Sequence, residues 1–176
     1  MVAASRLYCR ITFLQELPMA ITHHFIQDAD DVFALMTSAD ALTQRCQDLG
    51  EKNIQCSVEE NGRKTLVNLS RTVKRDLPKV LAAMFSAENT IRMKEQWETI
   101  GSTYMGSYSA EVVGQPVALS AKFKLKPSAD GGCDYTIDYQ CKASIPLVGK
   151  KVEEFIISQT AGGLGQEINW LKKKLG

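Results

Sequence analysis

The chain has almost no excess of charge of either sign. It carries 21 Lys and Arg residues against 20 Asp and Glu residues, which gives a formal net charge of +1 over 176 residues. A protein that binds the phosphate backbone of nucleic acids normally gathers basic residues on one face, so this balance argues against a nucleic acid as partner. The 44% of apolar and 23% of charged residues are instead typical of a globular domain.

Long apolar runs are also missing. No stretch approaches the ~18 consecutive apolar residues that a membrane-spanning helix needs. No apolar segment of about seven or more residues follows Arg6, as a secretory signal would require. We therefore expect a cytoplasmic protein.

The cysteines lack the close spacing of zinc sites and redox motifs. They are Cys9, Cys46, Cys56, Cys133 and Cys141. Cys133 and Cys141 lie in one alternating segment, which would separate them by roughly 26 Å in a strand, whereas a disulfide needs Cα atoms within about 7 Å. We expect free thiols, no metal site and no cofactor.

The first residues differ from the remainder of the chain. Residues 1–18 show little periodicity, and regular patterning begins only after a second methionine, Met19. This contrast predicts that residues 1–18 lie upstream of the true start and that one domain covers residues 19–176. A targeting segment is the alternative that Arg6 and Arg10 leave open.

Hydrophobic periodicity predicts an α+β domain in the order strand, two helices, six strands and a long helix. The predicted strands cover 20–27, 53–59, 63–73, 90–99, 103–113, 117–126 and 133–145, and the helices cover 28–36, a segment from Ser38 or Asp40 to Leu49, and the C-terminal stripe from 148 to 175. Asn61-Gly62 between two alternating runs indicates a tight hairpin. The long alternation of the last two strands is typical of an antiparallel sheet with one buried face.

The predicted sheet is too wide for one helix to cover. Seven strands at about 4.8 Å spacing span roughly 30 Å, but a helix covers only about 10 Å. The sheet must therefore curve around the C-terminal helix, with the short helices and residues 74–89 filling the remaining space. Small inward residues leave room for a pocket; they are Gly106, Ala110, Ala121, Cys133, Cys141 and Ala143. Aromatic residues are predicted to wall it; they are Trp97, Tyr104, Tyr108, Phe123, Tyr135, Tyr139 and Phe155. A solid core of interlocked rings is the alternative.

Several short segments resemble the START-like, or SRPBCC, helix-grip superfamily. Ser144–Glu153 (SIPLVGKKVE) is similar to the strand-to-helix junction of a bacterial family in it, domain-of-unknown-function family 2505. Ala29–Ala34 (ADDVFA), Arg45-Cys46 and Trp97 support the resemblance, which covers about residues 19–175. It implies a helix-grip fold, a curved seven-stranded antiparallel sheet around a long C-terminal helix in the order βααββββββα, with a deep cavity for apolar molecules. It brings no recognised catalytic residues.

Two opposite charges are predicted to share the buried face of adjacent strands. Glu95 is in phase with Met93 and Trp97, and Arg71 is in phase with Leu69. Because an isolated buried charge is costly, we expect Arg71 and Glu95 to pair. They would then anchor a polar group of a ligand, or Glu95 would act as an acid or base with a raised pKa. A purely structural ion pair is the alternative.

Other polar groups are weaker candidates. His23 and His24 point to opposite faces of a strand, and His23 is the better pocket candidate. The segment Ala161–Gly165 lacks the Lys-Ser/Thr of a phosphate loop, so its glycines are expected to thin the helix where it crosses the cavity, or to permit a kink. Gln159 and Thr160 beside it offer hydrogen bonds to a ligand.

These patterns favour a protein that binds or carries an apolar small molecule, lipid, sterol-like or polyketide-like. The predicted ligand-binding residues are Arg71, Glu95, Trp97, Tyr108, Phe123, Tyr135, Tyr139, Phe155 and Gln159. One alternative is a cyclase or hydrolase that uses Glu95, Arg71, His23 or Tyr108 in the same cavity. Another is a protein-interaction module with 74–89 as its docking surface. Lys172–Lys174 are too few for a membrane-binding patch, so we expect membrane contact to be transient at most.

Overall fold

The computed structural model describes residues 19–176 apart from 83–84. The prediction that residues 1–18 precede the true start concerns residues outside the described part. Within that part, the elements are β1 (Met19–Phe25), α1 (Ala29–Met36), α2 (Ala39–Asp48), β2 (Lys52–Asn61), β3 (Lys64–Lys74), α3 (Lys79–Ala82), β4 (Glu88–Ile100), β5 (Thr103–Val112), β6 (Val117–Pro127), β7 (Cys133–Ala143) and α4 (Gly149–Leu175). The predicted order is confirmed, with α3 as a single turn inside the 74–89 stretch.

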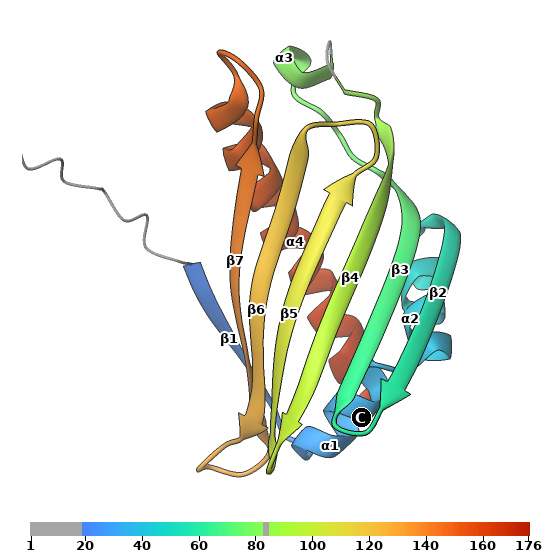
Figure 1. Cartoon of the computed structure of the whole chain (residues 1–176), viewed down its shortest axis with the longest axis vertical. Helices are drawn as coiled ribbons and strands as arrows, with labels where there is room; N and C mark the ends of the chain where they lie inside the picture. Colours follow the sequence, from blue (N-terminus) through green and yellow to red (C-terminus); the bar gives the residue numbers. More distant parts are fainter. Residues whose placement is uncertain (1–18, 83–84) are drawn as a thin grey trace, which may run out of the picture.

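The strands form one antiparallel sheet in the order β1-β7-β6-β5-β4-β3-β2. From β2 to β7, strands that are consecutive in the chain are neighbours in the sheet, and β1 lies beside β7 at the edge. A two-residue turn, Gly62-Arg63, joins β2 and β3, with Asn61 still paired to Lys64 and Gly62 at φ +59°. The predicted hairpin is confirmed, but its turn lies one residue later than the predicted Asn61-Gly62. The α4 helix runs behind the sheet for most of its length (Figure 1). The fold is thus the α+β helix grip that the sequence predicts.

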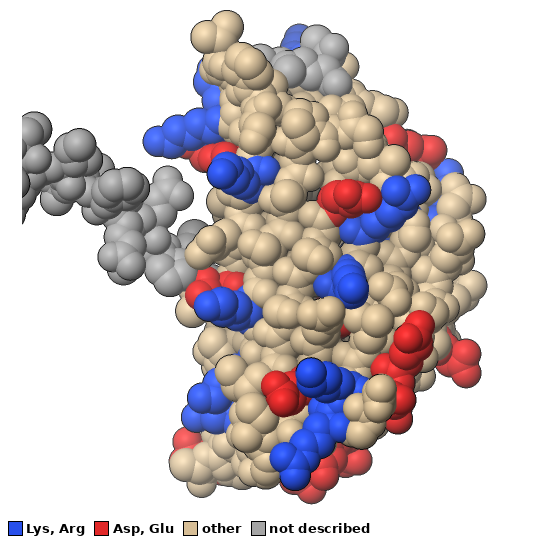
Figure 2. Space-filling model, viewed as in Figure 1, with Lys and Arg blue, Asp and Glu red and all other residues tan. Residues whose placement is uncertain are grey.

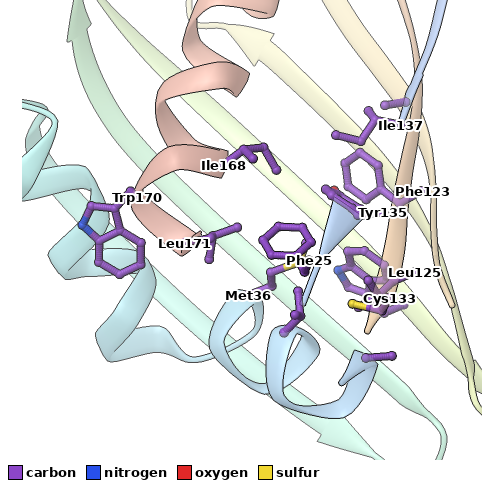
Figure 3. Close-up of a cluster of buried hydrophobic side chains, with 14 of the residues drawn as sticks. Phe25, Met36, Phe123, Leu125, Cys133, Tyr135, Ile137, Ile168, Trp170 and Leu171 are labelled. Atoms are coloured by element: carbon purple, nitrogen blue, oxygen red, sulfur yellow. The ribbon is translucent and has the colours of Figure 1, made fainter. Parts of the chain in front are cut away.

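The main hydrophobic core lies where α1 and the end of α4 meet the sheet. This cluster brings together Phe25 of β1, Met36 of α1, Phe123 of β6, and Ile168 and Leu171 of α4 (Figure 3). A smaller cluster at the α3 end joins Leu81, Val117, Ala143 and Val152. The two clusters hold the helix to the sheet near its two ends (Figure 1).

Trp97 belongs to the packed core. Its ring lies over Gly106 of the next strand, where a Cβ atom would come within 2.8 Å of the indole. The lack of a side chain at Gly106 therefore makes room for the Trp97 ring, and not for a pocket as the sequence pattern predicted. Phe33 meets the same indole edge-on, at 5.5 Å between ring centroids.

Tyr104 also packs against protein. Its ring stacks on Phe33 with 3.9 Å between centroids, and its hydroxyl donates to Asp30 Oδ1 at 2.8 Å. For Tyr104 and Trp97 the alternative of interlocked rings was therefore the correct one.

The outer face of the sheet carries charges of both signs. Figure 2 shows Lys and Arg side chains next to Asp and Glu side chains over this face. Arg92 and Glu111, on adjacent strands, form one such exposed pair at 3.4 Å. In the described residues no group of three or more His, Cys, Asp or Glu side chains is placed to hold a metal ion. No helix of that part is long and apolar enough to cross a membrane.

Candidate ligand-binding cavity

A cavity of about 210 Å³ lies between the inner face of the sheet and α4. One water molecule needs about 10–15 Å³ of such space, so there is room for a ligand of many atoms. Strands β3 to β7 line it on one side, and α4 lines it on the other. It exists because one helix cannot cover the inner face of seven strands.

All but one of the predicted ligand-binding residues line this cavity. Those that do are Arg71, Glu95, Tyr108, Phe123, Tyr135, Tyr139, Phe155 and Gln159. Trp97 is the exception, because its ring is 2% exposed and packs on Gly106. His23 of β1 lies opposite Tyr135 of β7 in register, and it is not part of the cavity lining. Ligand contact by these residues stays a prediction.

A row of polar side chains crosses the inner face of the sheet. Strand register places Glu95 opposite Tyr108, Tyr108 opposite Ala121, and Ala121 opposite Tyr139. All four residues line the cavity. Because Ala121 is small, space remains between the two tyrosines.

Arg71 and Glu95 do not pair with each other, so the predicted ion pair is wrong. Arg71 Nε lies 2.8 Å from Glu51 Oε2, and its Nη2 lies 3.5 Å from Glu167 Oε1. Glu95 instead accepts a hydrogen bond of 2.9 Å from Trp97 Nε1. The pairing differs because Glu51 and Glu167 come from outside the two strands, where strand parity carries no information.

Three charged residues of this cluster were missed as site residues. They are Arg45 on α2, Glu51 before β2 and Glu167 on α4. Arg45 Nη1 lies 3.4 Å from Glu167 Oε2, so Glu167 bridges both guanidinium groups. The signal that could have found Glu167 is its place on α4 beside Ile168, on the stripe that faces the sheet.

Burial changes the acid–base properties of the cavity wall. Desolvation raises the pKa of the Glu95 carboxyl, partly offset by its hydrogen bond from Trp97 and by Arg45. Desolvation also raises the pKa of the Tyr108 phenol. Burial therefore shifts both groups toward their neutral forms, in which they can donate a hydrogen bond.

The cysteines offer little nucleophilic character. Those in the described residues, Cys46, Cys56, Cys133 and Cys141, are free, as predicted. Burial, followed by a hydrogen bond with Glu51, raises the pKa of Cys46 to about 12. Burial also raises the pKa of Cys133 to about 11. At neutral pH these side chains are thiols, so they behave as small apolar groups.

The glycine-rich part of α4 has one residue on the cavity. Gly163 lines the space, and a Cβ atom there would lie 3.9 Å from Arg75 Nη2. Gly162 is exposed, with nothing within 4 Å of such an atom. The helix is therefore thinned on the cavity side at Gly163, in line with the expected role of the glycines.

Solved structures share this fold at low sequence identity. A protein of Thermus thermophilus (TTHA0849) is 10% identical, with a TM-score of 0.58, over 88% of this chain and 93% of that one. A protein of Rhizobium leguminosarum is 12% identical, with a TM-score of 0.55, over 89% and 95%. Ara h 8.0201 is 15% identical, with a TM-score of 0.50, over 88% and 97%. At this level of identity, the likeness shows that these proteins share the fold.

No curated protein is significantly similar to the chain in sequence. A family model does match, over residues 20–173, and its description is "protein of unknown function (DUF2505)". That match spans the described strands, except for Met19 of β1, and nearly all of α4. The chain therefore belongs to the DUF2505 family and has the helix-grip fold.

Proposed function

We propose that this protein binds and carries an apolar small molecule, lipid, sterol-like or polyketide-like, in the cavity between sheet and α4. The observation that carries the proposal is the cavity itself, about 210 Å³ in a domain with two well-packed clusters at its ends. Well-packed interiors rarely leave voids of this size. A space with mostly apolar walls and few polar groups is the usual form of a small-molecule site.

The wall provides both affinity and orientation. Val73, Leu119 and Ile156 are among its apolar residues, and burial of apolar ligand surface against them would contribute about 25 cal/mol per Å². The row from Glu95 to Tyr139 offers a few polar contacts in the middle of that surface. This division between apolar area and a few directed hydrogen bonds suits a binding protein.

The 74–89 stretch favours ligand binding over a protein-docking role. Leu77, Leu81 and Phe85 line the cavity, and Leu81 is only 2% exposed. These apolar side chains close one end of the cavity, so they are not offered to a partner protein on the surface.

Catalysis is the second candidate, and one observation favours it. The Glu95 carboxyl faces the cavity, and burial raises its pKa, as in many general acids. The expected sign of such an activity is turnover of a bound compound that Glu95→Gln abolishes while binding persists. Binding without turnover in both forms supports carriage.

The proposal is tested by filling the cavity from inside. Ala121 lies on the inner face of β6, between Tyr108 and Tyr139 in register, and Ala118 lies exposed on the outer face of the same strand. We expect Ala121→Phe to weaken binding of the apolar dye Nile red at least 10-fold, because the ring occupies ligand space. The matched control Ala118→Phe should bind like the unmodified protein.

Thermal unfolding of both variants shows whether each remains folded. Saturable dye binding that is equal in all three folded proteins would place the site elsewhere and overturn the proposal.

A further inference from the structure

Three hydrogen-bond donors on the cavity wall lack a hydrogen-bond partner in the described residues: Arg45 Nε, Arg71 Nε and the Tyr139 hydroxyl. Arg71 Nε lies 2.8 Å from Glu51 Oε2 in an ion pair, so only the other two have neither kind of partner. Arg45 and Tyr139 both line the cavity and are 7% and 4% exposed. Arg45 Nε and the Tyr139 hydroxyl are buried without a hydrogen-bond partner in the described part of the chain. Native proteins rarely leave buried donors unpaired, so each such group needs an explanation. A ligand oxygen that accepts from them would supply one.

The charges around Arg45 are already balanced. The two guanidinium groups of Arg45 and Arg71 face the carboxylates of Glu51 and Glu167, at 2.8 to 3.5 Å. These two guanidinium groups and two carboxylates sum to zero, and burial shifts the neighbouring Glu95 carboxyl toward its neutral form by raising its pKa. Arg75 and Glu111 also line the cavity, outside this group of ion pairs. An ionised ligand would add an uncompensated charge to a buried site, which is costly.

The polar row also has apolar rows on both sides of it. Toward α3 lie Leu119 and Met93, and toward α1 lie Phe123 and Ile137. A ligand that spans the cavity therefore meets apolar walls on either side of the polar row. Its acceptor must lie within an apolar body, as in a ketone or ester, rather than form a charged end group.

We propose that the cavity takes a neutral apolar molecule with an internal oxygen acceptor, such as a ketone, aldehyde or ester, and that Arg45 Nε and the Tyr139 hydroxyl donate to it. This inference rests on the proposed function and narrows its ligand class. A neutral oxygen can accept a hydrogen bond from an unpaired donor without adding a charge to the balanced cluster. A carboxylate accepts hydrogen bonds but adds a negative charge, and an ammonium group adds a positive charge and accepts no hydrogen bond.

Four probes on one aromatic scaffold test it, by displacement of Nile red. They are 2-acetonaphthone, 2-ethylnaphthalene, 2-naphthoate and 2-naphthylmethylammonium, which differ only in the group attached to the ring. We expect 2-acetonaphthone to bind about 2- to 10-fold tighter than 2-ethylnaphthalene, the effect of gained hydrogen bonds. Both ionised probes should bind more weakly than either neutral one.

The variant Tyr139→Phe removes only the unpaired hydroxyl. It should lose most of the preference for 2-acetonaphthone, while its midpoint of thermal unfolding stays equal or rises, because an unsatisfied polar group is gone. Tyr104→Phe is the matched control: it loses the bond to Asp30, lies outside the cavity lining, and should keep the preference.

The outcomes separate this inference from the proposed function. Binding of both neutral probes with equal affinity, or an unchanged preference in Tyr139→Phe, overturns the inference and leaves apolar binding intact. Tightest binding of an ionised probe also overturns it. Failure of all four probes and of the dye to bind overturns both.

Discussion

The two ends of the cavity are built on different physical principles. At the α3 end, Leu81, Val117 and Val152 form a cluster of buried apolar side chains. At the wall near α2, Arg45 and Arg71 are buried and face several glutamates. The first region is stabilised by burial, which depends little on pH. The second is stabilised by charge balance, so it depends on protonation and determines which polar group a ligand can bring.

The largest expected effect comes from breaking the charge balance. Arg71→Met removes the ion-pair partner of Glu51 and leaves Glu167 with Arg45 alone, so we expect a loss of about 3–5 kcal/mol in the free energy of unfolding. Urea unfolding at pH 7 measures it. The matched control is Arg92→Met on β4, whose partner Glu111 is exposed and whose loss should change stability by less than about 1 kcal/mol. Equal losses in the free energy of unfolding for the two substitutions would show that burial does not make the inner ion pairs more important for stability than the exposed pair.

A smaller effect is expected at the apolar end. Val152 is 1% exposed, and Val152→Ala removes two buried methyl groups, which should lower the free energy of unfolding by about 1–2 kcal/mol. Its neighbour Lys151 is exposed, and Lys151→Ala should change stability by no more than about 0.5 kcal/mol. The loss in Val152→Ala should be the same at pH 5 and pH 8. A strong pH dependence there would contradict the contrast between the two ends.

The smallest effect, and the one specific to the charged wall, is the pH dependence from Glu95. Its folded-state pKa lies above the ordinary value of 4.5, because burial penalises the carboxylate. The folded protein therefore holds a proton over a pH range in which the unfolded chain releases it. Tighter binding of this proton by the folded state stabilises it. The stabilisation is fully present below pH 4.5 and is lost as the pH rises through the raised pKa of Glu95.

Glu95→Gln should remove that decline, so the variant should lose less stability than the unmodified protein between pH 4.5 and neutral pH. Glu98→Gln, exposed on the same strand, should leave the decline in place. Urea unfolding at several pH values is the measurement. Identical pH profiles of stability for Glu95→Gln and the unmodified protein would show that Glu95 does not cause the loss of stability with rising pH.

Sequence patterns predicted the sheet and its inner face because alternation within a strand is a local property. The alternation in β6 and β7 placed Phe123, Tyr135 and Tyr139 on the side that lines the cavity. The same parity could not predict the direction of the Trp97 ring, which depends on the absence of a Cβ atom at Gly106 on the next strand.

The ion-pair partners of Arg71 could not be predicted from the pattern within a single strand, for a related reason. Arg71 and Glu95 do face the same side of the sheet, as parity predicted. The partners of Arg71 are brought to it by α4 and by the turn before β2, more than 90 residues away in the case of Glu167. Such contacts follow from the packing of the whole fold, so a single-strand pattern cannot show them.

Ligand carriage in the cavity is tested by native mass spectrometry of gently purified protein, followed by organic extraction. We expect a signal for the chain with one bound molecule of neutral apolar character, present in the Ala118→Phe control and lost in Ala121→Phe. Added 2-acetonaphthone should give the same one-to-one complex with protein from which bound molecules have been extracted. A folded protein that takes up neither a cellular molecule nor this probe would show that the cavity does not carry such a ligand.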